Sequence, residues 1–181
     1  MKETLEQKKS RITKIIARLK KAYGPVGCAL HFSNPMELLV AVILSAQCTD
    51  KRVNLVTPAL FKKYLKPEDY AKADPKTLEE EIRTTGFYKN KAKNIIAASK
   101  EIVSKHNGKV PDTLEELVEL PGVGRKTANA VLGNAYAVPG ICVDTHMIRL
   151  NRRLGLTKNT DPVKIEFDLM PLVLEKDWTD Y

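Results

Sequence analysis

Two residues of this chain stand where they could support covalent chemistry on a sugar. Lys126 follows a Leu-Pro-Gly-Val-Gly run (120–124), which predicts a tight turn leading into a helix. Asp144 ends a second Pro-Gly stretch (138–144), and we expect another helix to begin there. A neutral lysine amine can attack a sugar C1′ atom and form a Schiff base. A nearby carboxylate can stabilise the positively charged sugar or act as a base. The pair indicates an enzyme that acts on DNA.

The turn before Lys126 has the composition of a phosphate site. Gly122 and Gly124 can adopt positive φ and let the backbone approach a ligand closely. The first N–H groups of the following helix lack intrahelical partners, and together with the helix dipole they favour an anion such as a DNA phosphate. Such contacts position a protein without reading bases. An ordinary link between packed helices is the alternative for Pro-Gly-Val-Gly alone, and the residues Arg125, Lys126 and Thr127 favour the phosphate site.

Helical spacing predicts two faces on the segment after the turn. Asn129, Ala130 and Gly133 follow Lys126 on one side, and their small size would let a nucleotide come close. Shielding of the lysine there would disfavour its ammonium form. An exposed surface lysine is the alternative. The opposite face is predicted to be core and comprises Ala128, Val131, Leu132 and Ala135.

Asp144 opens the next expected helix, where the dipole stabilises a carboxylate. A simple N-cap role is the alternative, and both roles are compatible. His146 is more typical of a packed or capping residue than of a catalyst. A basic stripe, either a solvated face or a phosphate-binding one, is expected opposite Met147, Leu150 and Leu154, and it comprises Arg149, Arg152 and Arg153.

Composition sets broad limits on the function. The 181 residues suffice for one sizeable domain or two small ones, and the net charge is +8 with a pI near 9.3. That charge suits a nucleic-acid binder but also a solubilising surface. The three cysteines, Cys28, Cys48 and Cys142, contain no C-x-x-C pair, so they predict neither a zinc ribbon nor an iron–sulfur cluster and suit a reducing cytoplasm. The longest apolar run, residues 38–46, is too short to span a bilayer.

Almost every segment predicts helix, so the expected class is all-α with nine or ten helices. Three cap-then-proline pairs mark helix starts, at Asn34, Asp74 and Asp161. Pro58 predicts a kink or a break in the segment 50–64. We find neither strand alternation nor a short repeat. Thr113 with Glu116 predicts a further capping box, and Gly86 and Gly108 predict left-handed helix ends.

Four stretches carry a family resemblance. They are LSAQCTD at 44–50, GFYKNKA at 86–92, LPGVGRKTAN at 120–129 and VDTH at 143–146. From about His31 to its end the chain resembles the endonuclease III family of DNA base-excision glycosylases, within the helix–hairpin–helix superfamily whose members carry a downstream Gly/Pro-rich stretch and an aspartate. No one stretch is specific by itself, but the lysine in the hairpin and the later VDTH are specific together.

The resemblance implies roles for particular residues. Lys126 would be the nucleophile and Asp144 the essential acid. Gln47 would fill the gap left by an extruded base, and Phe87 stands at a wedge position where leucine or tyrosine is common. The hairpin Gly122–Gly124 would clamp phosphate, often with a monovalent cation on its carbonyls. Further DNA contacts would come from Lys91, Leu120, Val123, Arg125, Thr127 and His146.

The resemblance also implies a fold of two helical domains with DNA in the cleft between them. Residues 27–138 would form the central domain with the helix–hairpin–helix, and residues 1–26 and 139–181 the second. Relatives continue to four cysteines that hold a four-iron four-sulfur cluster. This sequence reaches Tyr181 without them, so we expect an incomplete second domain, no cluster and no protein-bound metal.

The expected function is a bifunctional DNA glycosylase and abasic-site lyase for oxidised pyrimidines such as thymine glycol. Its partner would be double-stranded DNA with damaged bases or abasic sites, and the protein would be a monomer in the cytoplasm, associated with a prokaryotic nucleoid and with no membrane. One alternative is a monofunctional mismatch glycosylase, although those enzymes generally lack a lysine at this place. The other is a helix–hairpin–helix module that binds DNA without catalysis.

Overall fold

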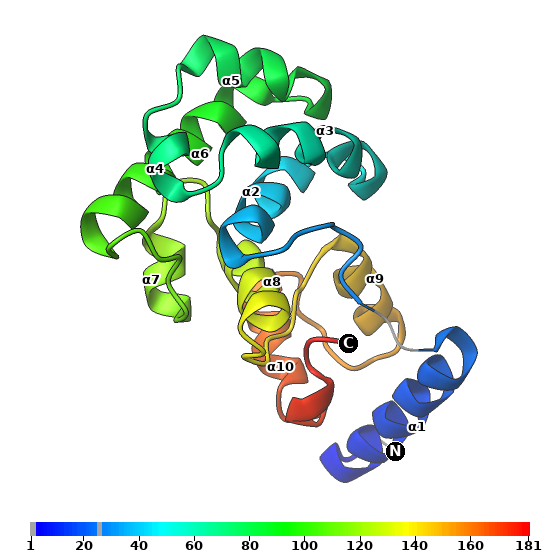
Figure 1. Ribbon diagram of the computed structural model, residues 1–181. Helices are drawn as coiled ribbons and strands as arrows, with labels where there is room; N and C mark the ends of the chain where they lie inside the picture. Colours follow the sequence, from blue (N-terminus) through cyan, green and yellow to red (C-terminus); the bar gives the residue numbers. More distant parts are fainter. Residues whose placement is uncertain (1–2, 25–26) are drawn as a thin grey trace. The chain divides into compact units, whose positions relative to one another are not determined.

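The computed structural model describes residues 3–24 and 27–181, and within these ranges it contains helices and no strand (Figure 1). The all-α prediction is confirmed. No helix in the described ranges is both long and apolar enough to cross a bilayer. Two short 3-10 helices, Arg83–Thr85 and Glu175–Asp177, accompany the α-helices. The α-helices are α1 (Leu5–Tyr23), α2 (Pro35–Ser45), α3 (Asp50–Lys63), α4 (Pro67–Ala71), α5 (Pro75–Glu81), α6 (Tyr88–Lys105), α7 (Leu114–Glu119), α8 (Arg125–Ala135), α9 (Thr145–Arg153) and α10 (Pro162–Leu169).

The chain forms two compact units. Unit 1 joins the two ends of the chain, Met1–Gly27 and Ala137–Tyr181, and unit 2 is the continuous stretch Cys28–Tyr136 between them. The domain limits expected from the sequence lie after residues 26 and 138. The first of them borders residues 25 and 26, which lie outside the described part of the chain.

Unit 2 is built around α2, which is apolar on every side and lies in the interior beside α3, α6 and α8 (Figure 1). Its residues from Met36 to Leu44 are buried, except the half-buried Glu37. The helix begins as predicted: Asn34 Oδ1 accepts the Glu37 N–H at 3.0 Å, and Pro35 fills the first helical position. The Glu37 carboxylate accepts the Ser33 N–H at 2.6 Å, which ties down the chain entering the helix.

Pro58 does not end its helix. The sequence predicted a kink or a break here, and the break does not occur, because α3 runs through this residue as one element from Asp50 to Lys63. Burial of Val53, Thr57 and Leu60 on one side of α3 holds both halves of the helix against the core. Tertiary packing of this kind can outweigh the loss of one backbone hydrogen bond.

Unit 1 has its own apolar core, in which α1 packs against the C-terminal part of the chain. Asn151, on α9, is 1% exposed, with its Nδ2 donating to the Met147 carbonyl at 2.9 Å and its Oδ1 accepting from the Tyr181 hydroxyl. Leu150 and Leu154, which lie opposite the basic stripe in the helical spacing, are 46% and 37% exposed. The core comprises Ile12, Ile16, Ile141, Val143, Leu156, Ile165, Leu169, Leu172 and Val173.

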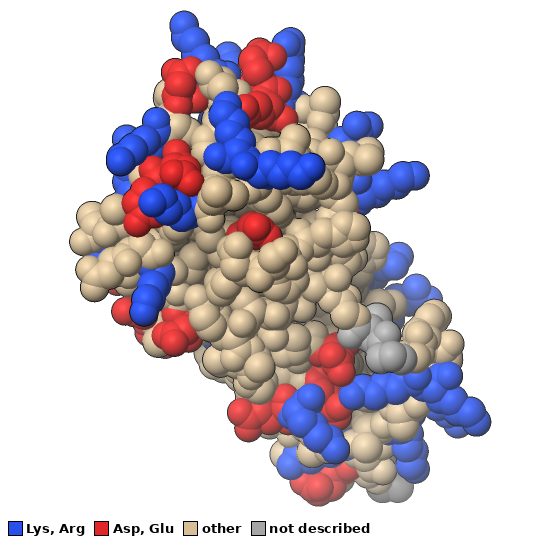
Figure 2. All heavy atoms as spheres, viewed as in Figure 1, with Lys and Arg blue, Asp and Glu red and all other residues tan. Residues whose placement is uncertain are grey.

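The positive charge is spread over the surface rather than gathered in one area of the visible face. Figure 2 shows Lys and Arg side chains over α1 and around α3 and α5, with Asp and Glu side chains among them, whereas the surface over α2 and α8 is mostly uncharged. The net charge of +8 therefore does not identify a binding surface on this face by itself, and local geometry has to do so.

Candidate nucleic-acid interface

The hairpin between α7 and α8 has buried side chains and exposed glycines. Leu120 and Val123 are 2% and 5% exposed, and the Val123 N–H donates to the Leu120 carbonyl at 3.0 Å. Both side chains belong to the core, so a ligand would meet the hairpin through its backbone. Gly122 has φ of +79°, as expected, whereas Gly124 has φ of −88° and serves as the N-cap of α8. Glycine has no side chain with which to cap, so no side chain occupies that cap position.

Lys126 is the second residue of α8 and is exposed. The expected partial shielding of this lysine within a cleft of small residues is not seen. One of those neighbours, Asn129, is only 4% exposed and is part of the buried side of the helix. Ala128, Val131 and Leu132 are buried as predicted. The helix is thus anchored along one side, and the lysine is presented to solvent.

Gln47 and Phe87 meet at a small cavity of about 250 Å³ within unit 2. Each has left-handed backbone, with φ of 52° and 48°. This conformation is costly for residues other than glycine and is enriched at functional sites, although Asn107 and Ala137 also adopt it. Phe87 is 64% exposed, an unusual state for a phenylalanine, and it occupies the N-cap position of α6 without contributing a capping side chain. The cavity is lined by Val42, Ile43, Ala46, Gln47, Phe87, Asn90, Lys91, Asn94, Gly122 and Thr127.

Residues of both the hairpin and α6 line this cavity. A Cβ atom at Gly122 would lie 2.5–2.6 Å from three atoms of the Asn94 side chain, so the glycine is what allows the two segments to approach. Asn90 and Asn94, missed by the sequence reasoning, add amide groups to the lining. Their spacing of three and seven residues from Phe87 along a helix was the signal available.

Lys91 does not reach solvent as a DNA-contacting lysine would. It is 4% exposed, and its Nζ donates to the Leu44 carbonyl at 2.8 Å and to the Thr85 carbonyl at 2.7 Å. Burial lowers its pKa from the usual value. The expectation of a direct DNA contact by Lys91 is therefore corrected, because its ammonium group is already satisfied by two backbone carbonyls.

Asp144 caps α9 in unit 1. Its Oδ1 accepts the Met147 N–H at 2.8 Å, and its backbone carbonyl accepts the Ile148 N–H at 2.9 Å. The buried side chain of Val143 anchors the preceding segment, and Asp144 itself is half-buried. The capping interaction fixes the orientation of the carboxylate, while a carboxylate has further acceptor capacity beyond one hydrogen bond. His146, in the first turn of α9, is exposed.

A cationic groove of about 570 Å³ lies in unit 1 along α9 and the segment after it. Its lining contains four cations and no carboxylate, and two threonines add hydroxyl groups. The groove includes the basic stripe that the helical spacing predicts. The lining residues are Thr145, Ile148, Arg149, Arg152, Arg153, Thr157 and Lys158.

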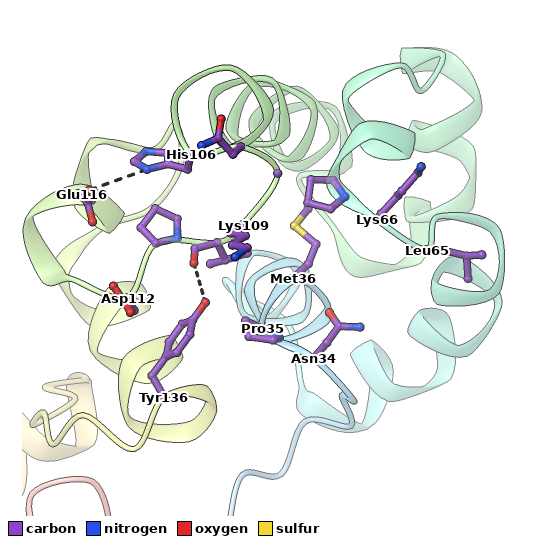
Figure 3. A pocket seen from close by; sticks show the side chains of 15 residues that line it. Asn34, Pro35, Met36, Leu65, Lys66, His106, Lys109, Asp112, Glu116 and Tyr136 are labelled. Carbon is purple, nitrogen blue, oxygen red and sulfur yellow. Dashed lines mark hydrogen bonds and ion pairs between the residues drawn. The ribbon is translucent and has the colours of Figure 1, made fainter.

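A larger cavity of about 580 Å³ in unit 2 is lined by none of the residues predicted to contact DNA (Figure 3). The His106 ring points toward Glu116, with Nδ1 3.9 Å from Oε1, and the Tyr136 hydroxyl donates to the Val110 carbonyl at 2.6 Å. These interactions link the loop 106–112 to its surroundings. We assign this cavity no part in DNA contact.

The cysteines offer no cluster site within the described ranges. Cys28 is exposed and Cys48 and Cys142 are half-buried, none of the three is in a disulfide, and no three described His, Cys, Asp or Glu side chains gather where a metal could bind. A four-iron four-sulfur cluster held by four cysteines does not fit these residues.

The chain is similar in sequence and in fold to known DNA repair proteins. Residues 40–174 match the HhH-GPD superfamily of base excision DNA repair proteins. Endonuclease III of Synechocystis is 52% identical over 98% of this chain and 81% of that protein. Two solved structures, a non-covalent endonuclease III–DNA complex and a trapped endonuclease III–DNA covalent intermediate, each superpose with a TM-score of 0.91 at 43% identity, over 95% of this chain and 81% of theirs. The helical glycosylase fold predicted from the sequence is confirmed.

Proposed function

Because this chain belongs to the endonuclease III family of HhH-GPD base excision DNA repair proteins, we propose that it excises oxidised pyrimidines from double-stranded DNA and cleaves the resulting abasic strand through Lys126. It is a DNA glycosylase with abasic-site lyase activity. One observation carries the assignment of the site. Thr127, the neighbour of the exposed Lys126, lines the same cavity as the strained residues Gln47 and Phe87.

The reaction begins with extrusion of the damaged nucleotide, because C1′ is inaccessible inside a stacked duplex. Extrusion leaves a gap opposite the partner base. Phe87 offers an exposed aromatic ring and Gln47 an exposed amide, from two segments that line one cavity. A ring can stack on neighbouring bases and an amide can hydrogen-bond the unpaired base. We assign these two residues to the gap.

Lys126 then acts as the nucleophile. Its neutral amine forms a bond to C1′ while the bond from C1′ to the damaged base breaks, and the base leaves with the electron pair and takes up a proton. Opening of the sugar ring gives a Schiff base. Loss of a C2′ proton then breaks the C3′–O bond, which releases the strand on the 3′ side. Hydrolysis of the imine frees the lysine.

Asp144 supports the charge changes of this sequence. Its carboxylate can stabilise the cationic sugar while the base departs, and it can accept a proton afterward. The hydrogen bond from the Met147 N–H holds the carboxylate in place without exhausting its acceptor capacity. Capping and catalysis are compatible roles for this residue.

Phosphate contacts hold the duplex at the site. The Gly122–Gly124 backbone and the start of α8 suit a phosphate group, with Arg125 and Thr127 beside them. The start of α9 with His146, and the cationic groove beyond it, suit further phosphates. A monovalent cation on the hairpin carbonyls stays a prediction, and no step above requires it.

We further propose that units 1 and 2 are the two domains of the glycosylase. Lys126 belongs to unit 2 and Asp144 to unit 1, so catalysis requires both. The bacterial origin of the Synechocystis relative supports placing the protein in a cytoplasm, where the chromosome lies.

Borohydride trapping tests the proposal. Borohydride reduces a Schiff base to a stable amine, so the wild-type protein should become covalently linked to an abasic duplex and to a thymine-glycol duplex. Lys126→Ala should form no adduct, and Asp144→Asn should form little on the damaged base. Lys62→Ala, a change at an exposed lysine of α3, is the matched control and should trap like wild type.

The same assay separates the alternatives. A monofunctional glycosylase would release base without trapping, and a binding module would shift DNA in a gel without releasing base or cleaving. Cleavage of abasic DNA by Lys126→Ala at the wild-type rate would reject the assigned nucleophile.

A further inference from the structure

The ammonium group of Lys91 lies in the interior of unit 2, between the ends of two helices. Its side chain is 4% exposed, and its Nζ lies 2.8 Å from the Leu44 carbonyl oxygen and 2.7 Å from the Thr85 carbonyl oxygen. Leu44 lies near the end of α2, and Thr85 ends a 3-10 helix about 40 residues further along the chain. One ammonium group therefore links two elements that are remote in sequence.

Both carbonyls stand at helix ends, where no following turn supplies a backbone N–H donor. Leu44 lies in the last turn of α2, and Thr85 is the last residue of Arg83–Thr85. The last carbonyls of a helix need an outside donor. Lys91 donates to both carbonyls, so each is hydrogen-bonded although its helix ends there.

The chain leaves each of these helix ends toward a strained residue. Gln47 follows Leu44 by three residues with φ of 52°, and Phe87 follows Thr85 by two with φ of 48°. Lys91, Gln47 and Phe87 line one cavity. The ammonium group thus anchors the starting points of the two segments that carry the gap-filling side chains.

Burial of a lysine between two loops costs free energy, because its ammonium group loses hydration. Desolvation disfavours its charged form, and burial lowers the pKa of Lys91 accordingly. An apolar side chain would fill the same volume without that cost, but it could not donate to either carbonyl. A role in fixing the distance between the loops that follow Leu44 and Thr85 would explain why a charged residue stands here.

We propose that Lys91 is a positioning residue for lesion recognition, which fixes the distance between Gln47 and Phe87 so that both enter the gap left by an extruded nucleotide. This inference rests on the proposed function. Lys91 touches neither substrate nor reacting atoms, and it acts through the backbones of the two loops. Its removal should impair steps that need the gap filled and spare the chemistry of Lys126.

The test compares two substrates with one variant. Lys91→Met keeps most of the side-chain volume and removes both hydrogen bonds. On a thymine-glycol duplex we expect kcat/KM to fall roughly 10- to 100-fold, as for a misplacement of about 1 Å remote from the chemistry. Borohydride trapping on a single-stranded abasic oligonucleotide, which has no gap to fill, should stay near wild type. Lys91→Arg, which keeps charge and donors, should restore part of the duplex activity.

A matched control is Lys93→Met, at an exposed lysine two residues further along α6, which should leave both substrates unaffected. An equal loss on both substrates, or no loss on the duplex, overturns the proposal. If Lys91→Met folds poorly, Lys91→Arg is measured in wild-type and Phe87→Ala backgrounds. The effect should shrink in the second background, and additive losses overturn the idea. Failure of the wild-type protein to trap any abasic DNA would instead reject the proposed function.

Discussion

Gln47 and Phe87 both have left-handed backbone, and they line one cavity although about 40 positions separate them in the chain. Two non-glycine residues with this costly backbone at one cavity are a pattern that is enriched at functional sites.

Replacement of both residues by alanine should weaken binding to lesion DNA more than binding to undamaged DNA. Loss of stacking is worth roughly 1–3 kcal/mol per base, and undamaged duplex offers no gap in which to gain it. Binding titrations on matched duplexes measure the difference. Leu65→Ala, at a leucine 73% exposed in the same unit, is the control, and equal losses on both duplexes would reject the assignment.

Gly122→Ala should destabilise unit 2 more than Gly124→Ala does. At Gly122 the φ of +79° and the 2.5 Å approach to Asn94 Nδ2 both oppose a Cβ atom, and the strain alone costs about 1–3 kcal/mol. Gly124 has φ of −88°, and a Cβ atom there would meet nothing within 4 Å, so its change should cost no more than about 1 kcal/mol, from the lower preference for alanine at an N-cap. Denaturant unfolding compares the two variants. Asn94→Ala, combined with Gly122→Ala, removes two of the three close atoms but keeps the Asn94 Cβ atom at 2.6 Å, so it should recover only part of the loss. No recovery would show that the Cβ contact and the positive φ cause the loss.

Neutralisation of the cationic groove should flatten the salt dependence of DNA binding. With Arg149, Arg152 and Arg153 changed to glutamine, the slope of log K against log salt should decrease by about 1 for each phosphate that the protein no longer neutralises. The reduction in affinity should be similar for all sequences, because phosphates carry no base information. A second triple variant on α1, which removes the same charge from the same unit, is the control and comprises Lys14→Gln, Arg18→Gln and Lys21→Gln. Identical slopes for both triples would show that only net charge matters.

Tyr181 should make unit 1 sensitive to alkaline pH. Burial raises the pKa of its hydroxyl from 10.0 to about 12. The folded state therefore holds the proton that the unfolded state loses, so the stabilising contribution is complete below pH 10 and disappears as pH rises toward 12. We expect a loss of roughly 1–2 kcal/mol, allowing for partial exposure to solvent.

Unfolding of the wild-type protein and of Tyr181→Phe between pH 9 and pH 12 measures this contribution, since the variant lacks the ionisable group and should show a flatter curve. Tyr23→Phe, at a tyrosine 77% exposed, should follow wild type. Parallel curves for wild type and Tyr181→Phe would contradict the assignment.

Local signals in the sequence predicted much of this fold. The side chains of Asn34, Asp74 and Asp161 cap α2, α5 and α10 as expected, because the cap is a contact within four residues and needs no tertiary information. Thr113 caps α7, although its hydroxyl donates to the Glu116 carboxylate at 2.7 Å instead of forming the reciprocal backbone pair of a capping box.

The failures share one cause, since each depends on what packs against a residue from a distant part of the chain. The sequence alone suggested that Lys91 contacts DNA, because it does not show that the fold places the Leu44 and Thr85 carbonyls beside its ammonium group. The burial of Asn151, which the sequence analysis did not foresee, depends on Tyr181, 30 residues later, whose hydroxyl donates to it. The spacing of Asn94 from Phe87 places both on one face of α6, but the closeness of Asn94 to Gly122 depends on how α6 packs against the hairpin.

The division of the chain between its two units has a consequence for synthesis. Ile12 and Ile16 of α1 find their apolar partners in a core that extends to Val173. During translation, the first helix must therefore wait with an uncovered apolar stripe while the whole of Cys28–Tyr136 emerges and can fold as a unit. Unit 2 is therefore synthesised completely before unit 1, whose first helix can pack only when the C-terminal segment has been made.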